Sequence, residues 1–176
     1  MIKQLIKFYN ADSIEPIEFY GNCYNGNADL YTTMSYLPHV DTFPGADKDI
    51  NPLNDYAFNL NVTKSDKVKT AFYSFNGKKS VCDWTPDDYD DHDRVRDRHK
   101  KIKAKDWKKL SNENFQNFQL EYIANIEYNS LILYPSHYWH SVYIKEDWFT
   151  DTDRVTFTGF FETKTTSSKT KKLGFG

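Results

Sequence analysis

Two residues of metal-binding type, His39 and Asp41, stand two positions apart at the end of a strand-like run. On an extended segment, residues i and i+2 point their side chains to the same face. The imidazole and the carboxylate could therefore hold one cation without a bend in the backbone. An isolated pair of this kind is also common on protein surfaces, so further ligands decide whether it forms a metal site.

Further histidines, His137 and His140, lie far downstream between two strand-like runs. The runs 131–134 and 155–161 are rich in β-branched and aromatic residues, which favour strands. The pattern predicts a strand, a bend that carries the histidines, a short strand, a loop, and a last strand that begins near Arg154.

The segment Leu131-Ile-Leu-Tyr-Pro-Ser-His-Tyr-Trp-His140-Ser-Val142 resembles a signature of Fe(II)- and 2-oxoglutarate-dependent oxygenases. In their prolyl-hydroxylase-like branch this signature reads Leu-x-Leu-Phe-Pro-Ser-x-x-x-His-x-Val. The resemblance implies that His39, Asp41 and His140 bind Fe(II), because two imidazoles and one carboxylate leave coordination positions open for reactants. It selects His140 as the distal ligand and leaves His137 as a loop histidine.

The same resemblance implies that Arg154 and Thr156 bind the far carboxylate of 2-oxoglutarate, the cosubstrate used together with O2. A guanidinium group pairs with a carboxylate through two charge-assisted hydrogen bonds, and the Thr156 hydroxyl shares its strand face. A tyrosine on the strand before the histidine–aspartate pair would add a hydroxyl to the same carboxylate. Tyr31 and Tyr36 both fit this role, and the sequence leaves the choice open.

The rest of the chain consists mainly of strand-like runs separated by turn signals. Strands are expected at residues 1–8, 14–20, 30–37, 56–62, 70–75 and 118–126, with turns or loops at 21–27, 42–54 and Asn76-Gly77. Together with the resemblance, these runs predict a mainly β double-stranded β-helix, a jelly-roll or cupin-like barrel. We expect one domain over residues 1–162, a charged helical insert at about 78–118, and a polar tail at 163–176.

The insert contains an acidic run at 83–93 that passes directly into a basic run at 94–109. A helix beginning near Pro86 would place acids at its positive end and bases toward its negative end, a gain of ~0.3–1 kcal/mol per well-placed charge. A solvated helix, a grip on a substrate peptide and contact with nucleic-acid phosphates are all compatible with these charges. The acidic run would repel the phosphates.

Composition narrows the class of protein. The chain has 176 residues, 39% of them hydrophobic, which is enough for one domain with a substantial core. Its net charge of −2 provides no general attraction to nucleic acids or anionic membranes. Cys23 and Cys82 do not form a disulfide framework, and no long apolar run or leader pattern is found. We therefore expect a cytoplasmic protein, and the abundant Lys, Asn, Tyr, Phe and Ile are typical of an AT-rich source such as a phage.

These features together predict a dioxygenase that hydroxylates a protein or peptide side chain, with prolyl as the first candidate. One alternative is a catalytically silent, cupin-like binding module. Another is the same oxygenase chemistry on a nucleobase or a small metabolite.

Overall fold

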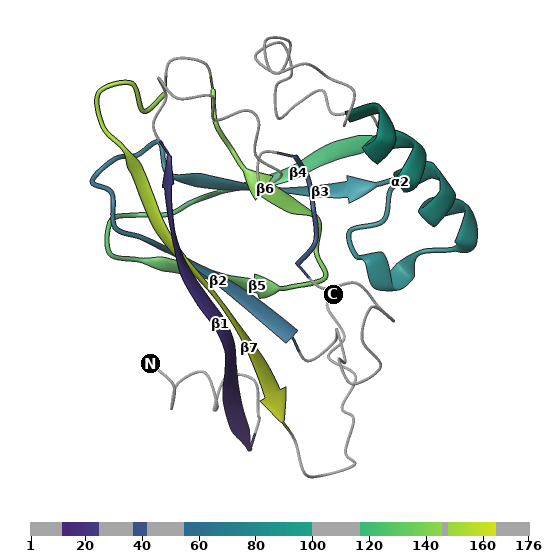
Figure 1. Ribbon diagram of the computed structural model, residues 1–176, viewed down its shortest axis with the longest axis horizontal. Helices are drawn as coiled ribbons and strands as arrows, with labels where there is room; N and C mark the ends of the chain where they lie inside the picture. The colour runs from purple at the N-terminus through teal and green to yellow at the C-terminus, as the bar shows by residue number, and fades with distance from the viewer. Residues whose placement is uncertain (1–11, 25–36, 42–54, 100–116, 146–147, 165–176) are drawn as a thin grey trace.

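Two antiparallel β-sheets and one α-helix make up the described part of a computed structural model of the chain (Figure 1). The structure describes residues 12–24, 37–41, 55–99, 117–145 and 148–164. In chain order the elements are β1 (Ser13–Tyr24), β2 (Asp55–Asn61), β3 (Lys69–Phe75), the short 3-10 helix η3 (Val81–Asp83), α2 (Pro86–His99), β4 (Phe118–Asn125), β5 (Leu131–Pro135), β6 (His140–Val142) and β7 (Arg154–Lys164).

The larger sheet has the strand order β1-β7-β2-β5. The last strand therefore lies between the first and the second, and every neighbouring pair is antiparallel. The smaller sheet has the order β4-β3-β6, so chain segments pass repeatedly between the two sheets. This arrangement is consistent with a jelly-roll, double-stranded β-helix.

The segment that carries His39 extends the smaller sheet. The backbone N–H groups of His39 and His140 each donate to the other residue's carbonyl at 2.9 Å, which forms an isolated antiparallel bridge beside β6. The backbone N–H of Asp41 donates to the Ser136 carbonyl at 2.9 Å. Two backbone hydrogen bonds thus hold His39 against the start of β6, and a third holds Asp41 against the residue that follows β5.

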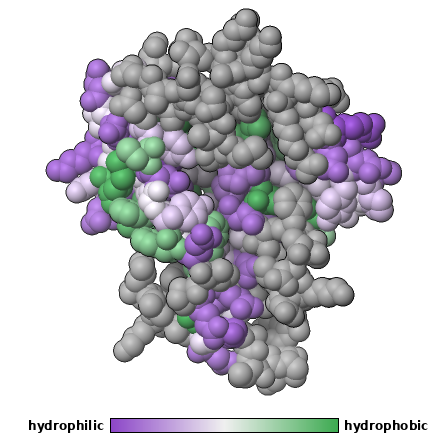
Figure 2. All heavy atoms as spheres, in the orientation of Figure 1, coloured by the Kyte–Doolittle hydropathy of each residue, from purple (hydrophilic) through white to green (hydrophobic). Residues whose placement is uncertain are grey.

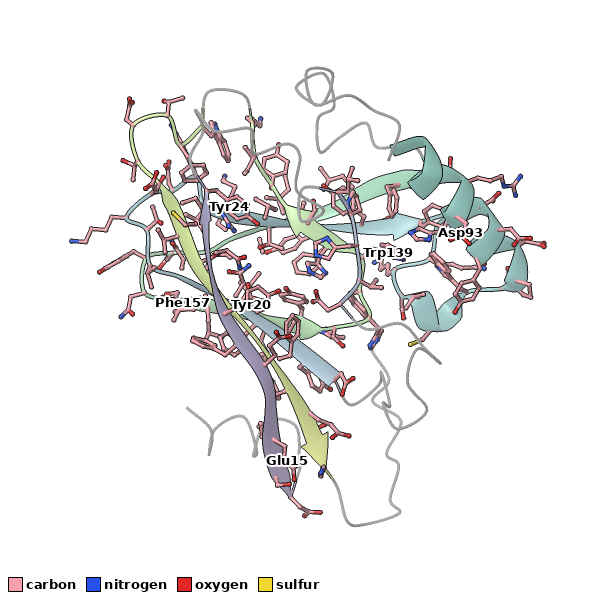
Figure 3. The ribbon with its side chains drawn as sticks, viewed as in Figure 1. Glu15, Tyr20, Tyr24, Asp93, Trp139 and Phe157 are labelled. Atoms are coloured by element: carbon pink, nitrogen blue, oxygen red, sulfur yellow. The ribbon has the colours of Figure 1, made fainter. Side chains whose placement is uncertain are left out.

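The two faces of β3 contact different regions of the molecule. Ala71, Tyr73 and Phe75 belong to the hydrophobic core, whereas Thr70 faces a cavity between the sheets. Trp139, only 1% exposed, lies in this core beside α2 (Figure 3), where its ring is 5.2 Å from the ring of His92. The alternation of side chains along β3 therefore separates core from cavity.

The expected helix begins at Pro86, a residue well suited to the first helical position. Asp88 caps this end, because its carboxylate accepts from the backbone N–H of Thr85 at 2.7 Å and from the Thr85 hydroxyl at 2.6 Å. Lys78 pairs with the same carboxylate.

The surface over α2 is hydrophilic (Figure 2). Among the described residues, no helix has the length and apolar character needed to cross a membrane.

The structure confirms most of the expected elements it describes, namely the strands near 14–20, 56–62, 70–75, 118–126, 131–134 and 155–161 and the turn at Asn76-Gly77. The turn expected at 21–27 is wrong in its first half, since β1 continues to Tyr24. Pairing with β7 overrides the turn preference of Gly21-Asn22, and the Asn22 amide donates to the Thr158 hydroxyl at 3.0 Å.

Several predictions fall outside the described residues. These are the strand at 1–8, residues 25–27 of the turn, most of the strand at 30–37, the loop at 42–54, much of the insert and residues 165–176 of the tail. The division into one domain, an insert and a tail stays a prediction.

Candidate metal centre

The side chains of His39, Asp41 and His140 converge at one point between the sheets. One potential ligand atom from each residue lies within 4.8 Å of the others. The two imidazole rings are 4.5 Å apart. This group, found among the described residues, leaves out His137, whose ring packs 5.1 Å from that of Tyr138.

Both imidazoles are oriented in the same way by the backbone. Nδ1 of His39 lies 2.8 Å from the Leu37 carbonyl, and Nδ1 of His140 lies 2.9 Å from the Tyr138 carbonyl. A carbonyl oxygen can only accept, so each Nδ1 must carry the proton. In the neutral rings Nε2 then has a free lone pair, as a metal-binding histidine requires.

These lone pairs face a carboxylate. Nε2 of His39 lies 3.9 Å from Oδ1 of Asp41, and Nε2 of His140 lies 3.4 Å from Oδ2. Burial lowers the pKa of both histidines to about 4, and the neighbouring His140 also lowers that of His39, so both rings are neutral at pH 7. Burial raises the pKa of Asp41 to about 6.

The donor set therefore fits a divalent cation. Oδ2 of Asp41 is buried and accepts no hydrogen bond from the described residues. Two lone pairs and a carboxylate repel one another at these distances unless positive charge lies between them. Imidazole and carboxylate ligands suit Fe(II), and a set of two histidines and one carboxylate leaves positions open for reactants.

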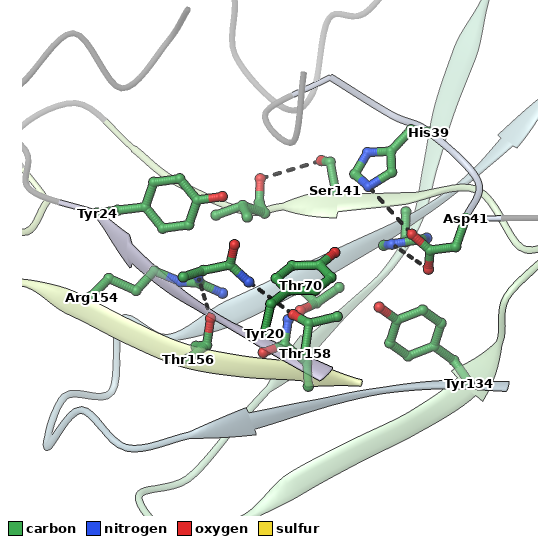
Figure 4. A pocket seen from close by; sticks show the side chains of 14 residues that line it. Tyr20, Tyr24, His39, Asp41, Thr70, Tyr134, Ser141, Arg154, Thr156 and Thr158 are labelled. Carbon is green, nitrogen blue, oxygen red and sulfur yellow. Dashed lines mark hydrogen bonds and ion pairs between the residues drawn. The ribbon is translucent and has the colours of Figure 1, made fainter. Parts of the chain in front are cut away.

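A cavity opens beside this centre, between β1 and β7 on one side and β3 and β6 on the other (Figure 4). Its described lining residues are Tyr20, Asn22, Tyr24, His39, Asp41, Asn59, Thr70, Tyr134, His140, Ser141, Val142, Arg154, Thr156 and Thr158. The lining is largely polar, and Oδ1 of Asn59 and Oγ1 of Thr70 are buried without a hydrogen-bond partner in the described part of the chain. The cavity is therefore suited to a polar ligand.

Arg154 is the buried cation of this cavity. It begins β7, is 0% exposed, and donates from Nη1 to the Thr156 hydroxyl at 3.1 Å. Its Nε and Nη2 atoms have no partner among the residues that the structure describes. Burial lowers its pKa to about 10, which still leaves it charged at pH 7. A buried charge without a counter-ion is costly, so the site favours an anion.

Several lining residues were not predicted from the sequence. Tyr20, Asn22 and Tyr24 lie on one face of β1 because they alternate, but Asn22 and Tyr24 were expected to lie in a turn. The ring of Tyr24 lies 5.4 Å from the Arg154 guanidinium carbon. Thr158 continues the alternation of Arg154 and Thr156 along β7. This two-residue spacing could have identified Thr158 from the sequence.

Tyr134 was visible in the sequence only as the residue that stands where the oxygenase signature has phenylalanine. Its ring packs 4.7 Å from that of His140. Burial, together with the charge of Asp41, raises the pKa of its phenol well above the ordinary value. Tyr134 therefore brings a neutral hydroxyl to the cavity beside the metal ligands (Figure 4).

Asn59 on β2 and Tyr73 on β3 have different surroundings. Asn59 lines the cavity, whereas Tyr73 lies in the hydrophobic core, where its hydroxyl is 3.1 Å from that of Ser141. Tyr31 and Tyr36 lie outside the described residues, so their expected contact with the cosubstrate stays a prediction.

No protein-family model matches the sequence, and a comparison with curated proteins finds no match. Among solved structures, the chain is similar to an N-substituted L-amino acid dioxygenase from Burkholderia ambifaria. The alignment has 12% identity, covers 83% of this chain and 52% of that enzyme, and has a TM-score of 0.45. The chain thus spans about half the length of that enzyme. A likeness at this level does not transfer an activity.

Proposed function

We propose that this protein is an Fe(II)- and 2-oxoglutarate-dependent dioxygenase that hydroxylates an uncharged side chain of a protein or peptide, with prolyl as the first candidate. The observation that carries the proposal is the fully buried Arg154, whose guanidinium has two unpaired nitrogen atoms among the described residues. It lines the same cavity as His39, Asp41 and His140. A site for an organic anion thus adjoins a site for a divalent cation.

His39, Asp41 and His140 would hold the Fe(II) ion. When bound there, Fe(II) supplies the redox chemistry by which O2 and 2-oxoglutarate are converted, with the substrate, into succinate, CO2 and a hydroxylated product. The Nδ1 hydrogen bonds to the carbonyls of Leu37 and Tyr138 fix both rings before any ligand arrives.

Arg154 would orient the cosubstrate. Its free Nε and Nη2 atoms can donate to the two oxygens of one carboxylate, while Nη1 remains occupied by Thr156. The ring of Tyr24 covers the guanidinium, and Thr158 is held by Asn22. Because Arg154 is fully buried under this ring, its pair with a carboxylate would be shielded from water.

The charge of the cavity also bears on the primary substrate. Within the described part of the chain, Arg154 is the only buried lysine or arginine. Once 2-oxoglutarate has taken its donors, a second anion finds no buried cation in these residues. The part of the substrate that enters the cavity should therefore carry no negative charge, which favours a side chain within a peptide over a free acid.

The test is anaerobic addition of Fe(II) and then 2-oxoglutarate to the purified protein. The expected result is a visible metal-to-ligand charge-transfer band that appears only when both are present and that is absent in Asp41→Ala. Bound Fe(II) without a band at saturating 2-oxoglutarate would exclude the cosubstrate role. Failure to bind either would favour a silent, cupin-like binding module.

A further inference from the structure

A row of rings crosses the smaller sheet from an exposed tyrosine to the candidate metal ligands. Phe72 on β3 lies opposite Tyr122 on β4 and, on its other side, opposite His140 on β6. The isolated bridge then joins His140 to His39. Residues directly opposite in antiparallel strands have their side chains on the same face. The order across the sheet is therefore Tyr122, Phe72, His140 and His39.

The rings in this row are close enough to form one continuous surface. The Phe72 ring is 6.5 Å from that of Tyr122, with an interplanar angle of 25°, and 6.4 Å from that of His140. From the other sheet, the Tyr134 ring meets Phe72 edge-on at 5.3 Å. Tyr122 is 64% exposed, so this surface is open to solvent at its outer end. We refer to Phe72 and Tyr122 as the aromatic shelf.

A β-bulge lies next to the shelf. Tyr73 lies opposite Leu120 and the preceding residue of β3, Phe72, lies opposite Tyr122, so Glu121 is an extra residue in β4. From Lys69 to Phe72 the pairing is regular, and Phe72 with Tyr122 is the last pair before the bulge. Bulges of this kind re-aim side chains and are over-represented next to active sites. Here the Glu121 carboxylate accepts from the Ser74 hydroxyl at 2.7 Å.

The shelf is distinct from the cavity that contains Arg154. Of the described residues that line that cavity, none is Phe72 or Tyr122. The shelf and the cavity both adjoin His140, which lines the cavity and pairs with Phe72. The Tyr134 ring packs on both Phe72 and His140, so a ligand on the shelf would reach the metal ligands past this ring while the cavity holds the cosubstrate.

We propose that the aromatic shelf binds the primary substrate, a peptide whose aromatic or proline ring stacks on Tyr122 while a nearby residue of the same peptide reaches the metal. This inference rests on the proposed function. Neighbouring strands are ~4.8 Å apart, so Tyr122, two strands from His140, lies ~10 Å away across the sheet. An extended peptide spans about 3.3–3.6 Å per residue, so the stacked residue stands about two or three positions from the reacting one.

The peptide acetyl-Phe-Gly-Pro-Gly-Phe-amide tests the shelf, because it places a ring two positions from the proline in either chain direction. The control peptide has alanine in place of both phenylalanines. Binding is measured calorimetrically to the full chain loaded with Zn(II), which does not activate O2, and 2-oxoglutarate. We expect the phenylalanine peptide to bind about 3- to 10-fold more tightly than the control, the size of one favourable aromatic contact.

Three variants show whether this difference arises at the shelf. It should disappear in Tyr122→Ser and persist in Tyr122→Phe, which keeps the ring. It should also persist in Tyr128→Ser, which removes another exposed tyrosine that lies outside the row. Equal binding of the two peptides to the unaltered protein, no binding of either, or a full difference in Tyr122→Ser would each overturn the proposal.

A single-stranded oligothymidylate is the competing ligand, because nucleobases also stack on tyrosine. Binding of this oligonucleotide that depends on Tyr122, without peptide binding, would overturn the peptide assignment in favour of a nucleic acid. The charge-transfer band separates the two proposals. Tyr122→Ser should keep the band at unaltered intensity, and absence of the band in the unaltered protein would refute the proposed function whatever the peptides show.

Discussion

Nε2 of His140 lies 3.4 Å from Oδ2 of Asp41, and at pH 7 no hydrogen lies between them, because the neutral ring carries its proton on Nδ1 and the carboxylate is ionised. The neutral ring presents a lone pair to an acceptor that is itself buried. Such an arrangement is unfavourable without a cation and favourable with one. A substitution of Asp41 should therefore weaken metal binding but stabilise the metal-free protein.

Asp41→Asn should weaken Fe(II) binding by more than about 100-fold, because it removes a charged ligand. In the metal-free protein it should instead raise the free energy of unfolding by about 1 kcal/mol, since an amide N–H can donate to an Nε2 lone pair. Anaerobic Fe(II) titration and urea unfolding in the presence of a chelator measure the two effects. His137→Ala is the matched control. It should leave Fe(II) affinity unchanged, and loss of binding there would reassign the distal ligand.

Arg154→Lys should raise the 2-oxoglutarate concentration needed for the charge-transfer band by about 30-fold or more. Lysine keeps the charge but lacks the planar pair of donors in a buried site. Fe(II) affinity without 2-oxoglutarate should not change. Thr156→Val, which removes only the hydroxyl that accepts from Nη1, should have a smaller effect of about 3- to 10-fold. Equal 2-oxoglutarate affinity in the unaltered protein and both variants would refute the assignment of Arg154 as the anion site.

Asp88→Asn should lower the free energy of unfolding at pH 7 by about 1–2 kcal/mol. Burial alone would raise the pKa of Asp88, but hydrogen bonds from Lys78 and Thr85 outweigh it and hold the pKa well below the ordinary value. A depressed pKa means that the ionised carboxylate stabilises the fold above its unfolded pKa, and this contribution is lost as the pH falls below about 4. Urea unfolding at pH 7 and pH 3 should show the difference between the two proteins shrinking with acid.

Gly159→Ala should lower the free energy of unfolding by about 1–3 kcal/mol through overpacking. A Cβ atom at Gly159 would lie 2.4 Å from the ring of Phe58, its cross-strand partner. In the double variant Gly159→Ala with Phe58→Ala, the loss of unfolding free energy should be smaller than the sum of the two single losses, because the two sites are in contact. Gly21→Ala is the milder comparison, since its nearest contact would be 3.3 Å from Phe157. Strictly additive effects in thermal unfolding would contradict a direct clash.

The sequence by itself determined the local features of the protein. Alternation of side chains placed the Arg154 and Thr156 side chains on one strand face, and the structure confirms this placement by burying both. The helix start at Pro86 and the turn at Asn76-Gly77 follow from residue chemistry within a few positions. The resemblance of the segment around His140 selected three residues that the structure brings within ligand distance of one another.

Only the tertiary structure decided which distant strands lie side by side and in what register. It showed that β1 continues through Gly21-Asn22 because β7 pairs with it, and that Tyr134 meets His140 across the two sheets. The aromatic shelf depends on the register of β3 with β4, which sets Phe72 opposite Tyr122. A shift of one residue exchanges the two faces of a strand, and pairing between segments far apart in the chain sets that shift. Local residue patterns cannot encode it.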